Sequence, residues 1–296
     1  MKHNVLSLIL LPLAALAGCG IRYWNLTAGV DAQGLPISHH PSAYVLAAWG
    51  ILCFLLFAAL AATSQGRSGK SAVLHTHGAL TVIAYFGAVM FFFSVIADFT
   101  AALVDGPGMS APIMCLLGLF SGICLFVTAW MRGHGKATYP PLELVPDVYL
   151  VVKLILNFKG WSTDPIILDY CIMLFALIFV VLGFYYSTGF LFDLGKPRLT
   201  LLFTLCACLF SAVAVVDGIL DGSFATILEY LGFIAWLLPV CCLTLTRRPV
   251  PSPFPVPRMH RKQKTKLPPI KCKIASVGFV LQRRSLLCDV WIIPDP

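Results

Sequence analysis

Four ionisable residues interrupt or border long apolar stretches, and their chemistry is the most informative in the sequence. Asp98 follows Phe-Ser-Val-Ile-Ala, Lys153 follows Leu-Val-Val, Asp169 lies at the start of an apolar run, and Glu229 stands between Leu and Tyr-Leu. A Lys at the bilayer centre costs roughly 2.5–3.5 kcal/mol on insertion scales, so intramembrane charges usually face the bundle interior and pair. We therefore expect Lys153 to pair with at least one of the three acids, and the four side chains to mark an outward-facing polar cavity.

The same residues also have a simpler interpretation. Asp98 is seven residues from Asp105, and Glu229 lies about one turn into its apolar run. Both carboxylates could then reach headgroup water, because the depth of a charge decides its cost in a membrane. Lys153 could place its amine at the interface by extending its four-carbon stem. In that case no cavity is needed, and the sequence leaves both interpretations open.

The elements that must position these residues are membrane-spanning helices. Of 296 residues, 59% are hydrophobic and only 11% are charged, which is outside the range of soluble globular domains. Apolar runs long enough for the hydrocarbon core recur along the chain, and predict an all-α, polytopic transmembrane helix bundle of about eight spans. Within the fourth span, Gly118-x-x-x-Gly122 has the spacing that lets membrane helices approach closely. The predicted spans are 5–21, 43–63, 76–104, 111–131, 142–158, 166–192, 199–216 and 224–245.

The charge is divided between a nearly neutral body and a basic tail. Residues 1–246 hold ten Lys and Arg against eleven Asp and Glu, whereas residues 247–296 hold eleven against two. The basic balance therefore does not indicate a nucleic-acid-binding body. The tail is rich in proline at first, which excludes a helix there, and we expect it to be disordered and cytoplasmic. Its basic cluster is either solvated or drawn to anionic lipid headgroups; the candidate contacts are Arg258, Arg261, Lys262, Lys264 and Lys266.

The basic loops predict which side of the membrane each span faces. Lys and Arg gather in cytoplasmic loops, and the basic connections or exits are Arg67/Lys70, Arg132/Lys136, Lys196/Arg198 and Arg247/Arg248. This alternation places both termini in the cytoplasm, provided that 142–158 crosses the bilayer. If that segment instead lies on the surface or re-enters, one basic loop is left outside.

Cysteines and histidines give little sign of a metal, cofactor or catalytic site. Eight of the eleven cysteines lie inside apolar runs, where they behave as small hydrophobic residues. Cys19 follows Leu-Ala-Gly, which matches a lipoprotein cleavage box and makes it a candidate lipidation site; the alternative is an ordinary first span. The sequence has no His-Glu-x-x-His, Gly-x-Ser-x-Gly or dinucleotide-binding fingerprint. We therefore expect no enzyme activity, no cofactor and no metal.

Two local patterns resemble bacterial multi-span membrane proteins of unknown activity. They are Arg22-Tyr23-Trp24-x-Leu with Gly34-Leu35-Pro36, and Asp164-Pro165 with Asp169-Tyr170. The resemblance covers the body and not the tail, and it implies a multi-pass location in a bacterial plasma membrane. The embedded charges favour a transport-related or permease-like function, because a polar cavity explains them more readily than a scaffold does. The alternative is a non-catalytic sensor or accessory subunit.

The predicted topology can be tested with reporter fusions at Gly135, Ser162 and Lys196. We expect cytoplasmic, external and cytoplasmic signals, respectively, because the basic loops stay inside. A cytoplasmic signal at Ser162 would show that residues 142–158 do not cross the bilayer.

Overall fold

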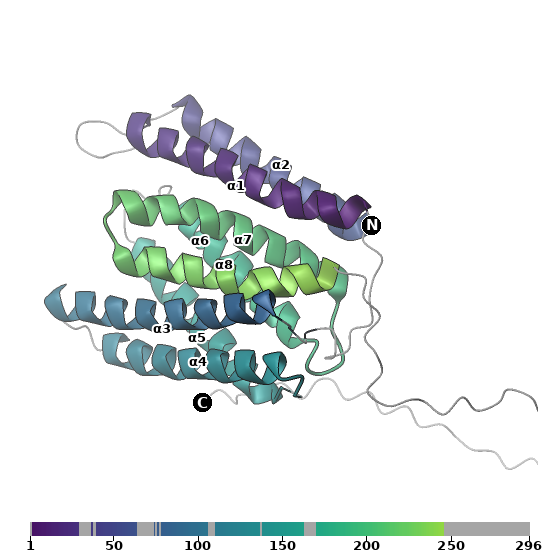
Figure 1. The fold of residues 1–296 in the computed structure, drawn as a ribbon. Helices are drawn as coiled ribbons and strands as arrows, with labels where there is room; N and C mark the ends of the chain where they lie inside the picture. Colours follow the sequence, from purple (N-terminus) through teal and green to yellow (C-terminus); the bar gives the residue numbers. More distant parts are fainter. Residues whose placement is uncertain are drawn as a thin grey trace, which may run out of the picture. The chain divides into compact units, whose positions relative to one another are not determined.

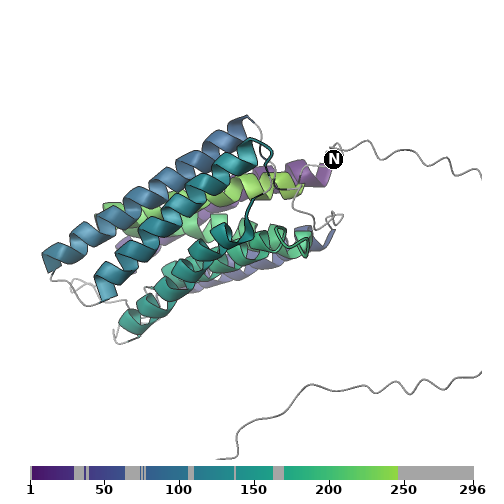
Figure 2. The same cartoon turned by 90° about the horizontal axis from the view of Figure 1, so that it is seen from below.

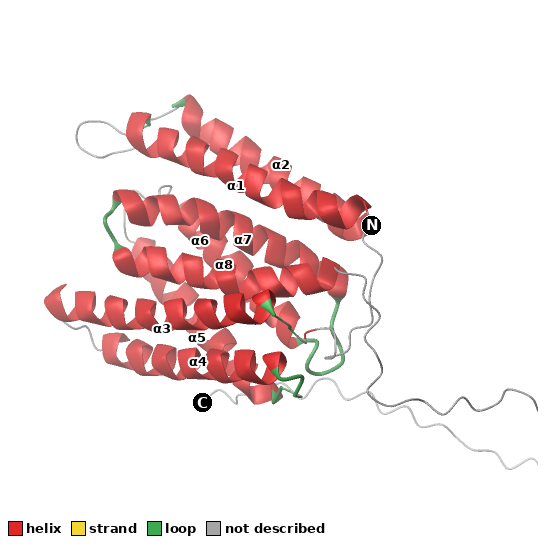
Figure 3. Cartoon of the chain, in the orientation of Figure 1, coloured by secondary structure: helices red, strands yellow, loops and turns green. Residues whose placement is uncertain are grey.

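The described part of the chain is helical, without a strand (Figure 3). The computed structural model describes residues 2–29, 37, 40–63, 74, 76, 78–105, 110–136, 138–162 and 170–245. All of them belong to one compact unit, Met1–Val250. The helices in these ranges are α1 (Lys2–Ala28), α2 (Pro41–Thr63), α3 (Ala79–Asp105), α4 (Ser110–Gly133), α5 (Pro140–Trp161), α6 (Cys171–Thr188), α7 (Pro197–Leu220) and α8 (Phe224–Leu245).

The predicted polytopic helical bundle is confirmed. Seven of these helices, all except α5, are long and apolar enough to cross a membrane. α5 differs because two acids and two lysines interrupt its apolar residues: Glu143, Asp147, Lys153 and Lys159. It nevertheless lies in the bundle against α4 and α6. Its crossing of a bilayer, and the side on which the termini lie, stay predictions.

Several boundaries differ from the predicted spans. α1 continues to Ala28 and α7 to Leu220, each beyond the residue at which its apolar run ends. Arg22 and Asp217 are therefore helical, although the sequence suggested that both lie in loops. α6 ends at Thr188, and the chain then turns through Asp193, whose φ of 55° is in the left-handed region.

Six helices form a closed ring, in which each packs against the next; Figures 1 and 2 show the bundle from the side. The order around the ring is α3, α4, α5, α6, α7 and α8, and α8 returns to α3. α1 and α2 form a hairpin that packs on α7, so this pair lies outside the ring, as Figure 1 shows. The ring encloses the side chains of the candidate site.

α3 and α8 meet at two glycines, Gly87 and Gly232. A Cβ atom on Gly87 would lie 2.7 Å from the backbone nitrogen of Trp236, and one on Gly232 would lie 3.0 Å from the nitrogen of Phe91. Distances this short leave no room for a side chain, so the two backbones are in direct contact. This contact fixes α8, and with it Glu229, against α3.

Gly118 and Gly122 on α4 also lie at close contacts, as their spacing suggested. A Cβ atom on Gly118 would be 2.7 Å from Val95, and one on Gly122 would be 2.9 Å from Phe92. In both cases the nearest atom belongs to a side chain of α3, and Tyr149 of α5 would also lie 2.9 Å from the Cβ atom on Gly118. The two glycines therefore accommodate large side chains of the neighbouring helix.

Replacing Gly87 with Ala should destabilise the bundle, because the new methyl group would meet the backbone of α8. Overpacking of this kind costs roughly 1–3 kcal/mol, and we expect a lower midpoint in thermal unfolding of the protein in detergent. The matched control is Gly20→Ala on α1, where nothing lies within 4 Å of the added Cβ atom. Equal melting temperatures for the two variants would contradict the close contact between α3 and α8.

Candidate functional site

The helix that carries Lys153 begins at two prolines and contains a third. Tyr139 precedes α5 in an extended conformation, and Pro140 and Pro141 occupy its first turn, where a missing N–H costs nothing. Pro146 lies inside the helix and cannot donate the hydrogen bond to the carbonyl four residues earlier. α5 is therefore weakened at Pro146, between Glu143 and Lys153.

Lys153 lies between two carboxylates from different helices. Its Nζ donates a hydrogen bond of 2.9 Å to Oδ2 of Asp98 on α3. The same nitrogen forms an ion pair with Oε1 of Glu229 on α8, at 2.6 Å. The structure thus brings together three of the four residues that the sequence singled out, and the lysine bridges three helices.

The three side chains differ in exposure. The side chains of Lys153 and Glu229 are 12% and 7% exposed, whereas that of Asp98 is 43% exposed. The residues lie seven, eight and five positions inside the ends of α3, α5 and α8, or about 10, 12 and 8 Å from the same end of the bundle at 1.5 Å per residue. They therefore share one depth, and Asp98 is the member that a solute would meet first.

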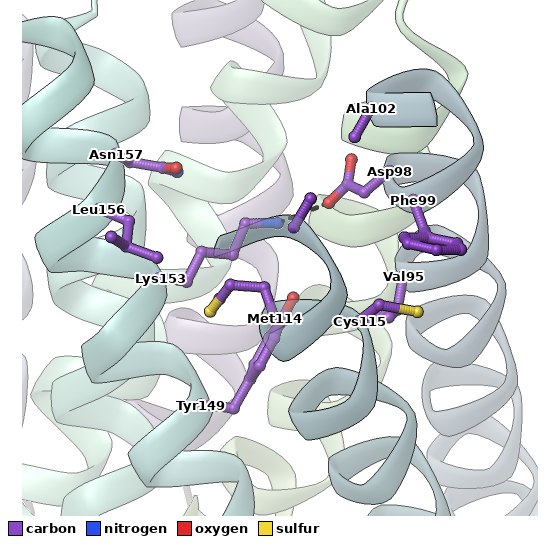
Figure 4. A pocket seen from close by; sticks show the side chains of 11 residues that line it. Val95, Asp98, Phe99, Ala102, Met114, Cys115, Tyr149, Lys153, Leu156 and Asn157 are labelled. Atoms are coloured by element: carbon purple, nitrogen blue, oxygen red, sulfur yellow. Dashed lines mark hydrogen bonds and ion pairs between the residues drawn. The ribbon is translucent and has the colours of Figure 1, made fainter. Parts of the chain in front are cut away.

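A cavity of about 240 Å³ adjoins Asp98 and Lys153 and is partly open to the surface. It lies between α3, α4 and α5. Figure 4 shows the amine of Lys153 directed toward Asp98, with the hydroxyl of Tyr149 pointing toward the same region. Asn157, one turn beyond Lys153, adds an amide to the lining. The rest of the lining is apolar: Val95, Phe99, Ala102, Ala111, Met114, Cys115 and Leu156.

An aromatic layer closes the middle of the ring below these charges. Its members come from α3, α5, α6 and α8 and are all buried: Phe91, Tyr149, Phe184, Phe233 and Trp236. Phe91 contacts Tyr149 edge-on and also contacts Phe233, and Phe184 contacts Phe233 and stacks on Trp236. Tyr149, at one end of the layer, lines the cavity, and Trp236, at the other end, lies beside Arg132. The layer therefore lies between the Lys153 group and the charges around Arg132.

A second group of charges lies beyond the aromatic layer. Arg132 at the end of α4 pairs with Glu143 in the first turn of α5, and its guanidinium lies 5.5 Å from the ring centre of Trp236. Both charged residues are at least 95% buried. Asp147, one turn after Glu143, accepts a hydrogen bond of 3.1 Å from the hydroxyl of Thr188 on α6. Its other oxygen has no hydrogen-bond partner among the described residues.

A third buried pair joins the outer hairpin to the ring. Nε of Arg22 on α1 lies 2.7 Å from Oδ1 of Asp217 on α7, and both side chains are 3% exposed. Arg22 also donates to Asn25, whose amide donates to Ser42 at the start of α2. The pair holds α1 and α2 against α7.

The sequence did not predict the ion pairs of Arg22 and Arg132, because each arginine borders an apolar run. Such positions are typical of interfacial or loop residues. In the sequence, such an ion pair is indicated only by an acid at a similar depth in another helix, as Asp217 is for Arg22.

The structure describes only one of the remaining candidate site residues, Cys19. Asp169 lies outside the described residues, as do the tail positions Arg258, Arg261, Lys262, Lys264 and Lys266. Cys19 lies inside α1, and its thiol donates to the carbonyl of Ala212 on α7. Lipidation of Cys19 stays a prediction.

No family model, curated protein or solved structure matches the chain. Among the described residues, no three His, Cys, Asp or Glu side chains are grouped so as to hold a metal ion. The function therefore has to be argued from the cavity and its charges.

Replacing Lys153 with Met should destabilise the protein, because two carboxylates would lose their counter-charge. Breaking a buried pair typically costs about 3–5 kcal/mol, so the melting temperature in detergent should fall clearly. Combining the change with Glu229→Gln should restore more stability than combining it with Asp98→Asn, since the carboxylate of Glu229 is the more buried one. Lys159→Met, an exposed change on the same helix, is the control. Strictly additive effects in both double variants would show that the three residues do not interact.

Proposed function

We propose that this chain is a membrane transport protein, permease-like in kind, whose solute enters the cavity beside Asp98 and Lys153. The observation that supports the proposal most strongly is the position of the cavity within the bundle. It is partly open, it borders a buried lysine with two acids, and Tyr149 of the aromatic layer lines it. Under the predicted topology it faces outward, in a bacterial plasma membrane.

The second charged group supports a path that continues toward the other side. Arg132, Glu143 and Asp147 lie in the half of the ring opposite the cavity, beyond Trp236 and Phe233. A solute that passes the aromatic layer would meet polar side chains again. Intramembrane charges on both sides of an apolar barrier are typical of substrate or ion pathways.

α5 is the helix most suited to move in such a cycle. It carries Lys153 on one side of the barrier and Glu143 on the other, and Pro146 weakens it between the two. It also carries Tyr149 of the aromatic layer. A bend at Pro146 would shift Tyr149 and Lys153 together, and so couple the barrier to the charges that line the cavity.

Flux measurements in proteoliposomes test the proposal. The full chain should mediate uptake of at least one labelled solute from a panel of small cations, anions, zwitterions and neutral compounds. Lys153→Met should reduce that uptake by about tenfold or more, because one charged hydrogen bond contributes roughly 1.5–3 kcal/mol. Lys159→Met should leave the uptake unchanged. A folded protein that moves no member of the panel would favour the non-catalytic sensor or accessory subunit.

A further inference from the structure

We infer that the cavity between α3, α4 and α5 binds a small organic monocation, an amine with a short apolar body. The inference deepens the proposed transport function and rests on it only for the passage of the amine across the membrane. Binding itself follows from the charges, the lining and the size of the cavity.

The charges around Lys153 do not balance. One ammonium group faces two carboxyl groups, those of Asp98 and Glu229, so with both acids ionised the group carries one excess negative charge. Glu229 is buried against Lys153 and does not line the cavity, whereas Asp98 and Lys153 both do. When both acids are ionised, Asp98, the more exposed one, presents the excess negative charge beside Lys153 on the lining. A negative charge in an apolar site attracts a cation and repels a carboxylate.

The geometry of Asp98 leaves an acceptor for that cation. Its Oδ2 accepts the hydrogen bond from Lys153, while Oδ1 has no hydrogen-bond partner in the described part of the chain. The amide of Asn157 and the hydroxyl of Tyr149 supply two further oxygens on the same lining. An ammonium group has up to three N–H donors to share among such acceptors.

The rest of the lining favours an amine over an inorganic cation. Val95, Met114 and Leu156 are apolar, and Phe99 and Tyr149 present aromatic rings. Ca²⁺ takes six to eight oxygen ligands, more than the side chains of this lining offer. Aromatic rings attract organic ammonium groups through their faces, and the aliphatic side chains would contact a short alkyl body.

The volume limits the size of the amine. At about 240 Å³, the cavity is smaller than the sites of roughly 300–1,000 Å³ that take drug-sized ligands. A primary amine with a few carbon atoms is a suitable probe, and n-butylammonium combines the required charge with an apolar body.

Binding is tested on the purified full chain in detergent by thermal unfolding and by titration calorimetry. The probes are n-butylammonium chloride, its neutral analogue 1-butanol, sodium butyrate, and sodium and potassium chloride at matched ionic strength. A ligand that binds only the folded protein raises the melting temperature in a saturable way. We expect this effect from n-butylammonium and from none of the other probes.

Variants connect the effect to Asp98. Asp98→Asn should weaken n-butylammonium binding by about ten- to a hundredfold, the size expected for one charged hydrogen bond. Asp98→Glu keeps the charge and should recover part of the affinity, which distinguishes a lost contact from a general loss of folding. Asp221→Asn, an exposed acid just after α7, is the matched control and should bind normally.

The outcomes separate the inference from the proposed function. Saturable binding of butyrate, of butanol or of an inorganic cation in place of the amine would overturn the amine assignment, as would normal binding by Asp98→Asn. If proteoliposomes carry another solute while n-butylammonium does not bind, the substrate class is wrong and transport stands. If n-butylammonium binds through Asp98 but no solute crosses, the site stands and the transport proposal fails.

Discussion

The buried amine of Lys153 is the constraint on which the central arrangement of this bundle depends. A charge that has left water needs a partner, and the partners here come from α3 and α8. The backbone of α5 packs against α4 and α6, and α5 contacts α3 and α8 through the side chains of Lys153 and Tyr149. The ring therefore closes around a charged bridge on one side and an aromatic layer at its centre.

Direct contact between α3 and α8 makes this bridge possible. Their backbones touch at Gly87 and Gly232, which holds Asp98 and Glu229 at one depth on neighbouring helices. Two carboxylates fixed in this way repel each other unless a cation lies between them. The lysine of α5 supplies that cation, so helix packing and charge pairing depend on each other.

The sequence predicted the helical bundle and the charged site better than the helix ends. Lys153, Asp98 and Glu229 were recognisable because each is embedded in apolar residues, where a charge needs a partner. Arg22, Arg132 and Glu143 border such runs, so nothing local distinguished them from interfacial residues. The contact at Gly87 and Gly232 was not predictable either, because each helix contributes one glycine and no spaced pair.

The number of buried ion pairs bears on whether the site is merely structural. Replacing a buried pair by apolar residues of similar volume is often neutral or even stabilising, so stability alone does not account for Arg22–Asp217, Arg132–Glu143 and the Lys153 group. The Arg22 pair has a plain structural role, since it joins the hairpin to α7. The other two groups lie on opposite sides of the aromatic layer, inside one closed ring. The proposed solute path would need this division, with polar side chains on both sides of an apolar barrier.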